Sequence, residues 1–126
     1  IGKLLDAGIR VSLFIEPDAR QIEASMHLRV PVIEFHTGRY AHLFQDDDMA
    51  GVEAELKRLA DAAALAAKNG IEPHAGHGLT FENVQPIAAI PQIAELNIGH
   101  YLVGEAIFIG LEESVRKMRT LMDAAR

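Results

Sequence analysis

Two glycine–histidine pairs are the residues best suited to chemistry in this 126-residue sequence. The first pair, His77-Gly78, lies between a strand-like and a helix-like segment, and the second pair, Gly99-His100, repeats that plan further along the chain. Glycine lets a ligand approach the backbone closely, and the free amide groups at the start of a helix attract anions. The two corners together predict a binding site for a phosphorylated small molecule.

Glu34 and His77 are the candidates for acid–base chemistry. Glu34 lies in an apolar stretch, where an ionised carboxylate is costly unless it is paired or used. It is either an inward carboxylate paired with a lysine or arginine, or a carboxylate whose pKa is tuned for catalysis. His77, between two glycines, has little reason to serve packing, and an imidazole titrates near neutral pH. The other histidines are interpreted as supporting residues (His36, His74), as surface residues (His27, His42) or as a phosphate contact (His100).

The sequence gives little support to other kinds of site. Cysteine and the HExxH pattern are absent, so zinc has no positive signal, and Asp46–Asp48 is interpreted as a helix cap. The nucleotide motifs GxGxxG and GxxxxGK[ST] are absent as well. A net charge of -6 argues against a nucleic-acid or acidic-membrane surface, and no apolar run approaches the roughly 20 residues of a membrane span.

The positions of these residues depend on an alternation of strands and helices. Four strands are predicted, at Arg10–Glu16, Val32–His36, Ile71–Ala75 and Glu95–Ile98. Helical segments lie between and after them, so the pattern predicts an α/β fold with a parallel sheet and right-handed crossovers. Ligands of such sheets sit at the carboxyl ends of the strands, which is where the candidate residues fall.

Several details of the elements are also predicted. The segment Arg39–Gln45 is expected to be a loop, and Thr80 with Asn83 is expected to cap a helix at 81–89. The apolar segment Tyr101–Ile109 is expected to form a short buried helical turn. The final helix is expected to bury the face formed by Leu111, Val115, Met118 and Leu121.

The length allows one domain, residues 1–126, and 49% hydrophobic residues allow a packed core. The chain starts at Ile1, without Met, within a helix-like segment closed by Gly8, so it is expected to be part of a longer chain. The lack of cysteine fits a cytoplasmic protein.

At these residues the sequence resembles the pyridoxine 5′-phosphate synthase family. The resemblance runs nearly end to end, through VSLFIEP, IEFHTG, HAGHGLTFENV, ELNIGH and GEAIFIGLEESVRKMRTLM. It implies a (β/α)8 TIM barrel, of which this chain covers the C-terminal half, strands five to eight. It also implies condensation of 1-deoxy-D-xylulose 5-phosphate with 3-amino-2-oxopropyl phosphate, with no metal or organic cofactor.

By this resemblance, His77 is the proton donor and Glu34 is the carboxylate that stabilises the transition state. Gly78 contacts the aminoketone phosphate, and Gly99 with His100 holds its phosphate. Further catalytic residues of the family lie in the other half of the barrel, so the chain alone is expected to be inactive or nearly so.

Half a barrel is expected to expose two sheet edges and an apolar inner face, and therefore to self-associate; the full-length family is expected to form homo-oligomers. Two other interpretations stay open. The chain could be a non-catalytic half-barrel module that binds phosphate ligands, or a flavodoxin-like or half-barrel structural domain in which the glycine–histidine corners are incidental.

Overall fold

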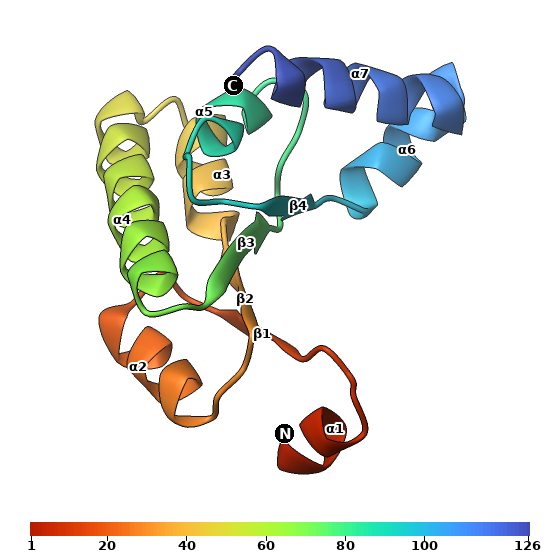
Figure 1. The fold of residues 1–126 in the computed structure, drawn as a ribbon. Helices are drawn as coiled ribbons and strands as arrows, with labels where there is room; N and C mark the ends of the chain where they lie inside the picture. The colour runs from red at the N-terminus through yellow and green to blue at the C-terminus, as the bar shows by residue number, and fades with distance from the viewer.

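The computed structural model describes residues 1–126 and contains a four-stranded sheet with helices between its strands (Figure 1). The strands are β1 (Ser12–Ile15), β2 (Val32–His36), β3 (Glu72–Gly76) and β4 (Glu95–Asn97). The helices are α1 (Gly2–Asp6), α2 (Ala19–His27), α3 (Gly38–Gln45), α4 (Met49–Lys68), α5 (Val84–Ala88), α6 (His100–Ile109) and α7 (Leu111–Asp123).

The sheet is parallel throughout, and its spatial order β1-β2-β3-β4 follows the chain. The predicted α/β class with a parallel sheet is therefore confirmed. Right-handed crossovers between strands in this order place the connecting helices on the same face of the sheet. In Figure 1, α2, α4, α3 and α5 lie along that face, and the opposite face has no helix in front of it.

The covered face of the sheet carries the core. Leu13, Ile33, Phe35, Ala75 and Leu96 alternate along the strands and pack in one cluster with apolar residues of the helices. Ile33, Phe35 and Ala75 are fully buried. This alternation fixes the register, because a shift by one residue would turn every one of these side chains to the other face.

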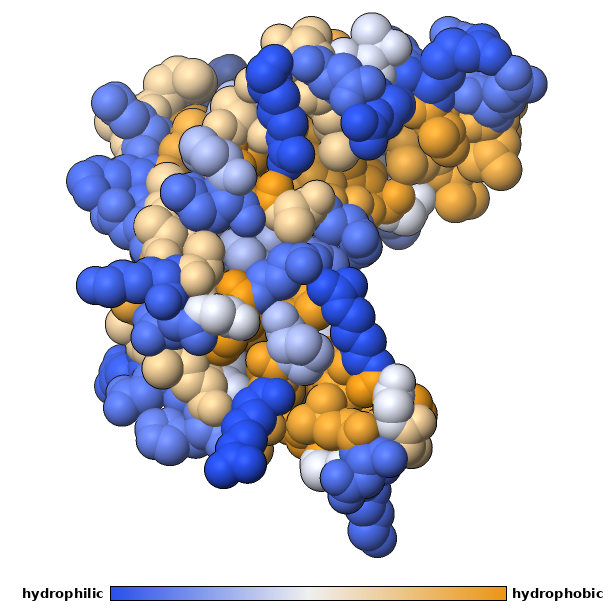
Figure 2. Space-filling model, viewed as in Figure 1, coloured by the Kyte–Doolittle hydropathy of each residue, from blue (hydrophilic) through white to orange (hydrophobic).

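The uncovered face of the sheet is mostly polar, with Phe14 and the buried Val32 as its apolar members, which corrects the prediction of an apolar inner face. The strand register places Glu34, His74 and Glu95 side by side on neighbouring strands. Four more polar side chains lie on this face, because they alternate along the strands with the core residues of the covered face: Ser12, His36, Glu72 and Asn97. Figure 2 shows the molecule hollowed on the side of this face.

Among the helices before β3, α4 buries an apolar stripe as its sequence pattern predicts, whereas α2 buries Ile22 and Ser25 and leaves Met26 exposed. The stripe of α4 buries Val52, Leu59 and Ala63, and the Asp48 side chain caps this helix by accepting a hydrogen bond from the Gly51 amide. The predicted loop at 39–45 is wrong, because α3 occupies it and buries Tyr40 and Ala41.

The last two helices are less buried than predicted. The segment at 101–109 belongs to the ten-residue α6, which has no buried residue, and Ile107 and Phe108 are 80% and 84% exposed. In α7 the buried residues are Ser114 and Met118, whereas Leu111 and Val115 are exposed. The predicted face of α7 is therefore wrong at two of its four positions. None of the helices has the length and apolar character needed to cross a membrane.

Candidate functional site

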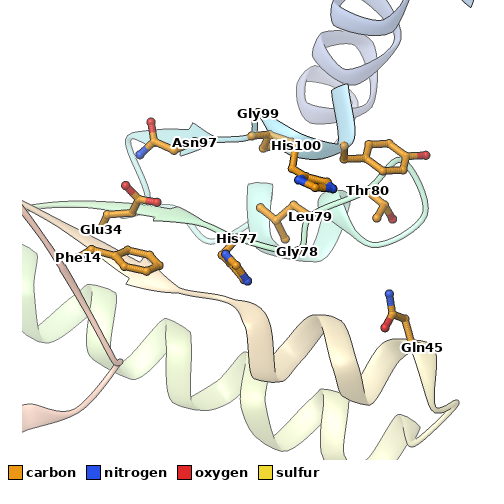
Figure 3. Close-up of a pocket in the computed structure, with 12 residues that line it drawn as sticks. Phe14, Glu34, Gln45, His77, Gly78, Leu79, Thr80, Asn97, Gly99 and His100 are labelled. Atoms are coloured by element: carbon orange, nitrogen blue, oxygen red, sulfur yellow. The ribbon is translucent and has the colours of Figure 1, made fainter. Parts of the chain in front are cut away.

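A cavity of about 590 Å³ lies at the carboxyl ends of the strands. All five residues singled out from the sequence line it: Glu34, His77, Gly78, Gly99 and His100. The other lining residues are Phe14, Gln45, Leu79, Thr80, Asn97, Ile98 and Tyr101. Figure 3 shows Glu34, Phe14 and Asn97 at one end of the cavity, His77 near the middle, and His100 and Thr80 toward the other end.

Glu34 projects from β2 toward the cavity, and a glycine on the next strand makes room for it. A methyl group added to Gly76 would overlap Oε1 of Glu34 and would lie 2.6 Å from the carbonyl oxygen of Asn97. The missing side chain thus lets Glu34 reach across β3 toward the side chain of Asn97 on β4, which lowers the pKa of the carboxyl.

Burial is the largest influence on the Glu34 carboxyl, and it raises the pKa above the usual value of 4.5. The side chain of Asn97 and the nearby His74 and His77 each lower this pKa, but each has a smaller effect than burial. No ion pair is formed by Glu34, so the interpretation as a paired structural carboxylate has no support. A carboxyl group with a raised pKa beside an imidazole can exchange protons with a bound molecule.

The His77 backbone has a left-handed conformation with φ of 83°, and Gly78 follows with φ of 79°. The left-handed conformation raises the conformational free energy of a non-glycine residue by about 1–2 kcal/mol. The buried Thr37 hydroxyl holds the corner, since it lies 2.7 Å from the carbonyl oxygen of Gly76 and 2.6 Å from that of His77. A histidine whose strained backbone is held by buried hydrogen bonds is typical of a residue that contacts a ligand.

Asn83 supports the same corner from the other side. Its side-chain amide donates to the Gly78 carbonyl at 3.1 Å, and its Oδ1 accepts from the Thr80 amide at 2.8 Å. The buried Tyr40 hydroxyl donates to the Asn83 carbonyl at 2.7 Å, and burial raises the pKa of Tyr40 to about 12. Thr80 and Asn83 therefore make the reciprocal contacts expected of a cap, since the Glu82 amide also donates to the Thr80 hydroxyl at 3.3 Å. They cap the turn at 81–83, and the helix itself begins later than predicted, at Val84.

Gly99 and His100 form the start of α6 at the cavity. The first backbone hydrogen bond of this helix runs from the Val103 amide to the Gly99 carbonyl at 3.0 Å. The amides of the first turn have no partner within the helix, and together with the helix dipole they favour an anion at this position. Gly99 has open space where a Cβ would stand, so a ligand can approach its backbone.

The supporting histidines are paired with carboxylates. The His36 ring lies against His77 with a centroid distance of 4.7 Å, and its Nδ1 is 2.9 Å from Oε1 of Glu16. His74 is nearly fully buried, and its Nε2 is 2.7 Å from Oε1 of Glu72. Neither histidine lines the main cavity, as the sequence predicted. No group of three or more His, Asp or Glu side chains is arranged to hold a metal ion.

Sequence reasoning missed Asn97 and Thr37. The signal for Asn97 was its position two residues after Glu95 in a strand, which places both side chains on the same face. Thr37 immediately follows a strand in a parallel sheet, a position that often contributes to a site.

The sequence of this chain is similar to that of one family of known proteins. Residues 1–124 match the family described as "Pyridoxal phosphate biosynthesis protein PdxJ". The chain is 63% identical, over all of its 126 residues and 48% of the relative's length, to the pyridoxine 5′-phosphate synthase of Zymomonas mobilis. Its identity to the proteins of the same name from Jannaschia sp. and Caulobacter vibrioides is 54% and 56%, over 51% and 49% of their lengths. The chain therefore spans about half the length of the curated relatives it matches.

Proposed function

This chain belongs to the PdxJ family of pyridoxal phosphate biosynthesis proteins, and we propose that it forms the C-terminal half of a pyridoxine 5′-phosphate synthase. The observation that carries this proposal is the convergence of Glu34, His77, Gly78, Gly99 and His100 on one cavity. The three relatives of this name described above are 54–63% identical to the chain.

The architecture supports a half-barrel. A barrel wall has its parallel strands in chain order and its helices on the outer face, as here. A flavodoxin-like domain has a reversal of strand order and helices on both faces, and neither is seen in this sheet. The other half of the barrel would cover the uncovered polar face.

The proposed reaction is ring closure between 1-deoxy-D-xylulose 5-phosphate and 3-amino-2-oxopropyl phosphate, with release of phosphate and water. Expulsion of water requires a proton at the departing oxygen, which the His77 imidazole can supply. Glu34 lies close enough to influence His77 and carries a charge that can stabilise a cationic intermediate. No metal or organic cofactor is part of the proposal.

Phosphate recognition is assigned to the two glycine-containing corners. The first turn of α6, at Gly99 and His100, offers unpaired amides to a phosphate. The exposed Gly78 lines the same cavity, and none of the backbone hydrogen bonds outside the regular elements is donated by its amide. These donors are in place before a ligand binds, which is the arrangement that stabilises developing charge most effectively.

A chimeric protein tests this function. The chain is joined to the part of the Zymomonas mobilis relative that its match does not cover, and formation of pyridoxine 5′-phosphate from the two substrates is measured. We expect turnover, and a loss of roughly 100- to 10,000-fold for His77→Asn because the proton donor is removed. The matched control is His42→Asn, an exposed histidine of α3 outside the cavity, which should retain full activity.

The competing function is binding of phosphate ligands without catalysis. The backbone amide donors at the two corners favour it, because they bind phosphate without any need for Glu34 or His77. It predicts that the chimera binds 3-amino-2-oxopropyl phosphate but forms no product, and that Glu34→Gln leaves the affinity unchanged. The chain by itself is expected to be inactive. Turnover by the 126-residue chain that disappears in His77→Asn would contradict this expectation.

Self-association also belongs to the proposal. Large apolar side chains are exposed on α6 and α7, namely Val103, Ile107, Phe108, Leu111 and Val115, and Figure 2 shows hydrophobic atoms gathered over these helices. Such a patch favours contact with another chain. Sedimentation equilibrium of the 13.8 kDa chain should reveal oligomers, and a monomer at all concentrations would refute this. A cytoplasmic location is proposed as well, and cell fractionation tests it.

A further inference from the structure

A chain of ionic contacts runs from helix α4 to the back of the catalytic cavity. Glu55 of α4 is almost fully buried and lies 2.6 Å from Nη2 of Arg58. The same Nη2 lies 3.3 Å from Oε2 of Glu16, which follows β1. Oε1 of Glu16 is 2.9 Å from Nδ1 of His36, which ends β2. Both oxygens of Glu16 are therefore held, one by the guanidinium and one by the imidazole.

The Glu16 contact determines which nitrogen of His36 carries a proton. An ionised carboxylate only accepts hydrogen bonds, so Nδ1 must be the donor in this pair. The neutral His36 ring then has its unprotonated nitrogen at Nε2, on the side of His77 and Gly38. A histidine without a fixed partner exchanges between its two tautomers, so the carboxylate selects one of them.

The His36 ring in turn supports His77. The two ring centroids are 4.7 Å apart at an interplanar angle of 41°. The Phe14 ring packs edge-to-face against His36, with a centroid distance of 5.2 Å. A methyl group added to Gly38 would lie 2.8 Å from Nε2 of His36 and 3.1 Å from Cδ2 of His77. The glycine therefore provides the space in which the two rings lie together.

We propose that Glu16, anchored by Arg58, is a positioning residue that fixes the tautomer and orientation of His36 and thereby the placement of the His77 imidazole. The proposal rests on the proposed function for its catalytic consequence, but its geometric part does not. Glu16 and Arg58 do not line the cavity and act only through His36.

The geometric part is tested on the 126-residue chain with ¹⁵N-labelled histidine, by recording long-range ¹H–¹⁵N spectra of the imidazoles. The wild-type chain should show His36 with its proton on Nδ1. In Glu16→Ala, which removes the acceptor, this preference should be lost and the His77 ring signals should shift. The matched control is Glu72→Ala, which removes the carboxylate contact of His74 and should leave the signals of His36 and His77 unchanged.

The catalytic part uses the active chimera. Glu16→Ala should lower kcat by roughly 10- to 100-fold through misplacement of His77, with KM changed less than about twofold. The exposed Glu113→Ala of α7 should leave both constants unchanged. An unchanged His36 tautomer, unchanged His77 signals or an unchanged kcat in Glu16→Ala would overturn the proposal. If the wild-type chimera forms no product, the proposed function fails, and the spectra alone then decide on the role of Glu16.

Discussion

Replacement of Gly76 by alanine should separate Glu34 from Asn97. The added methyl group would overlap Oε1 of Glu34 and lie 2.6 Å from the Asn97 carbonyl oxygen, whereas ordinary contacts begin at 3.4 Å. The Asn97 backbone would have to move by about 0.8 Å to reach that distance. Because Asn97 is the last residue of β4 and pairs with Gly76, this movement also strains the ladder between β3 and β4.

The expected cost is that of an overpacked site, about 1–3 kcal/mol of unfolding free energy. At a typical urea dependence for a chain of this size, this lowers the midpoint of unfolding by about 1 M. The carboxyl of Glu34 is also moved away from the Asn97 side chain, which lowers its pKa, so that pKa should rise further.

Urea unfolding followed by circular dichroism measures the effect, and carbon-detected NMR of Glu34 measures its protonation. The control is Gly104→Ala in α6, where nothing lies within 4 Å of the added methyl group. Alanine inside a helix should stabilise by about 0.5–1 kcal/mol, so the two substitutions should have opposite signs. A Gly76→Ala variant as stable as the wild type, with an unchanged Glu34 pKa, would refute the close-contact reasoning.

Two further substitutions examine the same site. Thr37→Val removes the buried hydroxyl that contacts the carbonyls of Gly76 and His77, and should lower the unfolding free energy by about 1–3 kcal/mol. The control, the exposed Thr120→Val, should change the unfolding free energy by less than about 0.5 kcal/mol. Equal effects of the two substitutions would contradict the supporting role of the Thr37 hydroxyl. Because burial raises the pKa of Glu34 in the folded chain, its stabilising contribution is complete below about pH 4.5 and is lost as pH rises through the folded value. Glu34→Gln should therefore gain stability relative to the wild type as the pH rises above about 4.5, and a difference that stays constant with pH would count against a raised pKa.

The sheet and the lining of the cavity could be predicted because their signals are local. Strand β2 was predicted at its observed bounds, and the glycine–histidine corners mark the carboxyl ends of β3 and β4. A parallel sheet brings such ends together whatever the details of the helices are. The predicted meeting of His77 with Gly99 and His100 in one cavity followed from that property alone.

The failures have equally specific causes. The segment 39–45 was predicted to be a loop, but Gly38 begins α3 there, and its missing side chain makes room for His36 and His77. Apolar residues all around α6 suggested burial, yet no part of the described chain covers Ile107 or Phe108. The contact between Glu34 and Asn97 depends on the register of three strands that are far apart in the sequence.

The polar face of the sheet sets a requirement on whatever lies against it. Glu34, Glu72 and Glu95 place three carboxylates there, and only Arg10 offers a permanent positive charge, through its contact of 2.7 Å with Glu72. An apolar partner would strip water from these carboxylates without replacing it, at a cost of several kcal/mol for each ion. Association across this face must therefore supply cationic or hydrogen-donating side chains or retain water, and its strength should fall as the salt concentration rises.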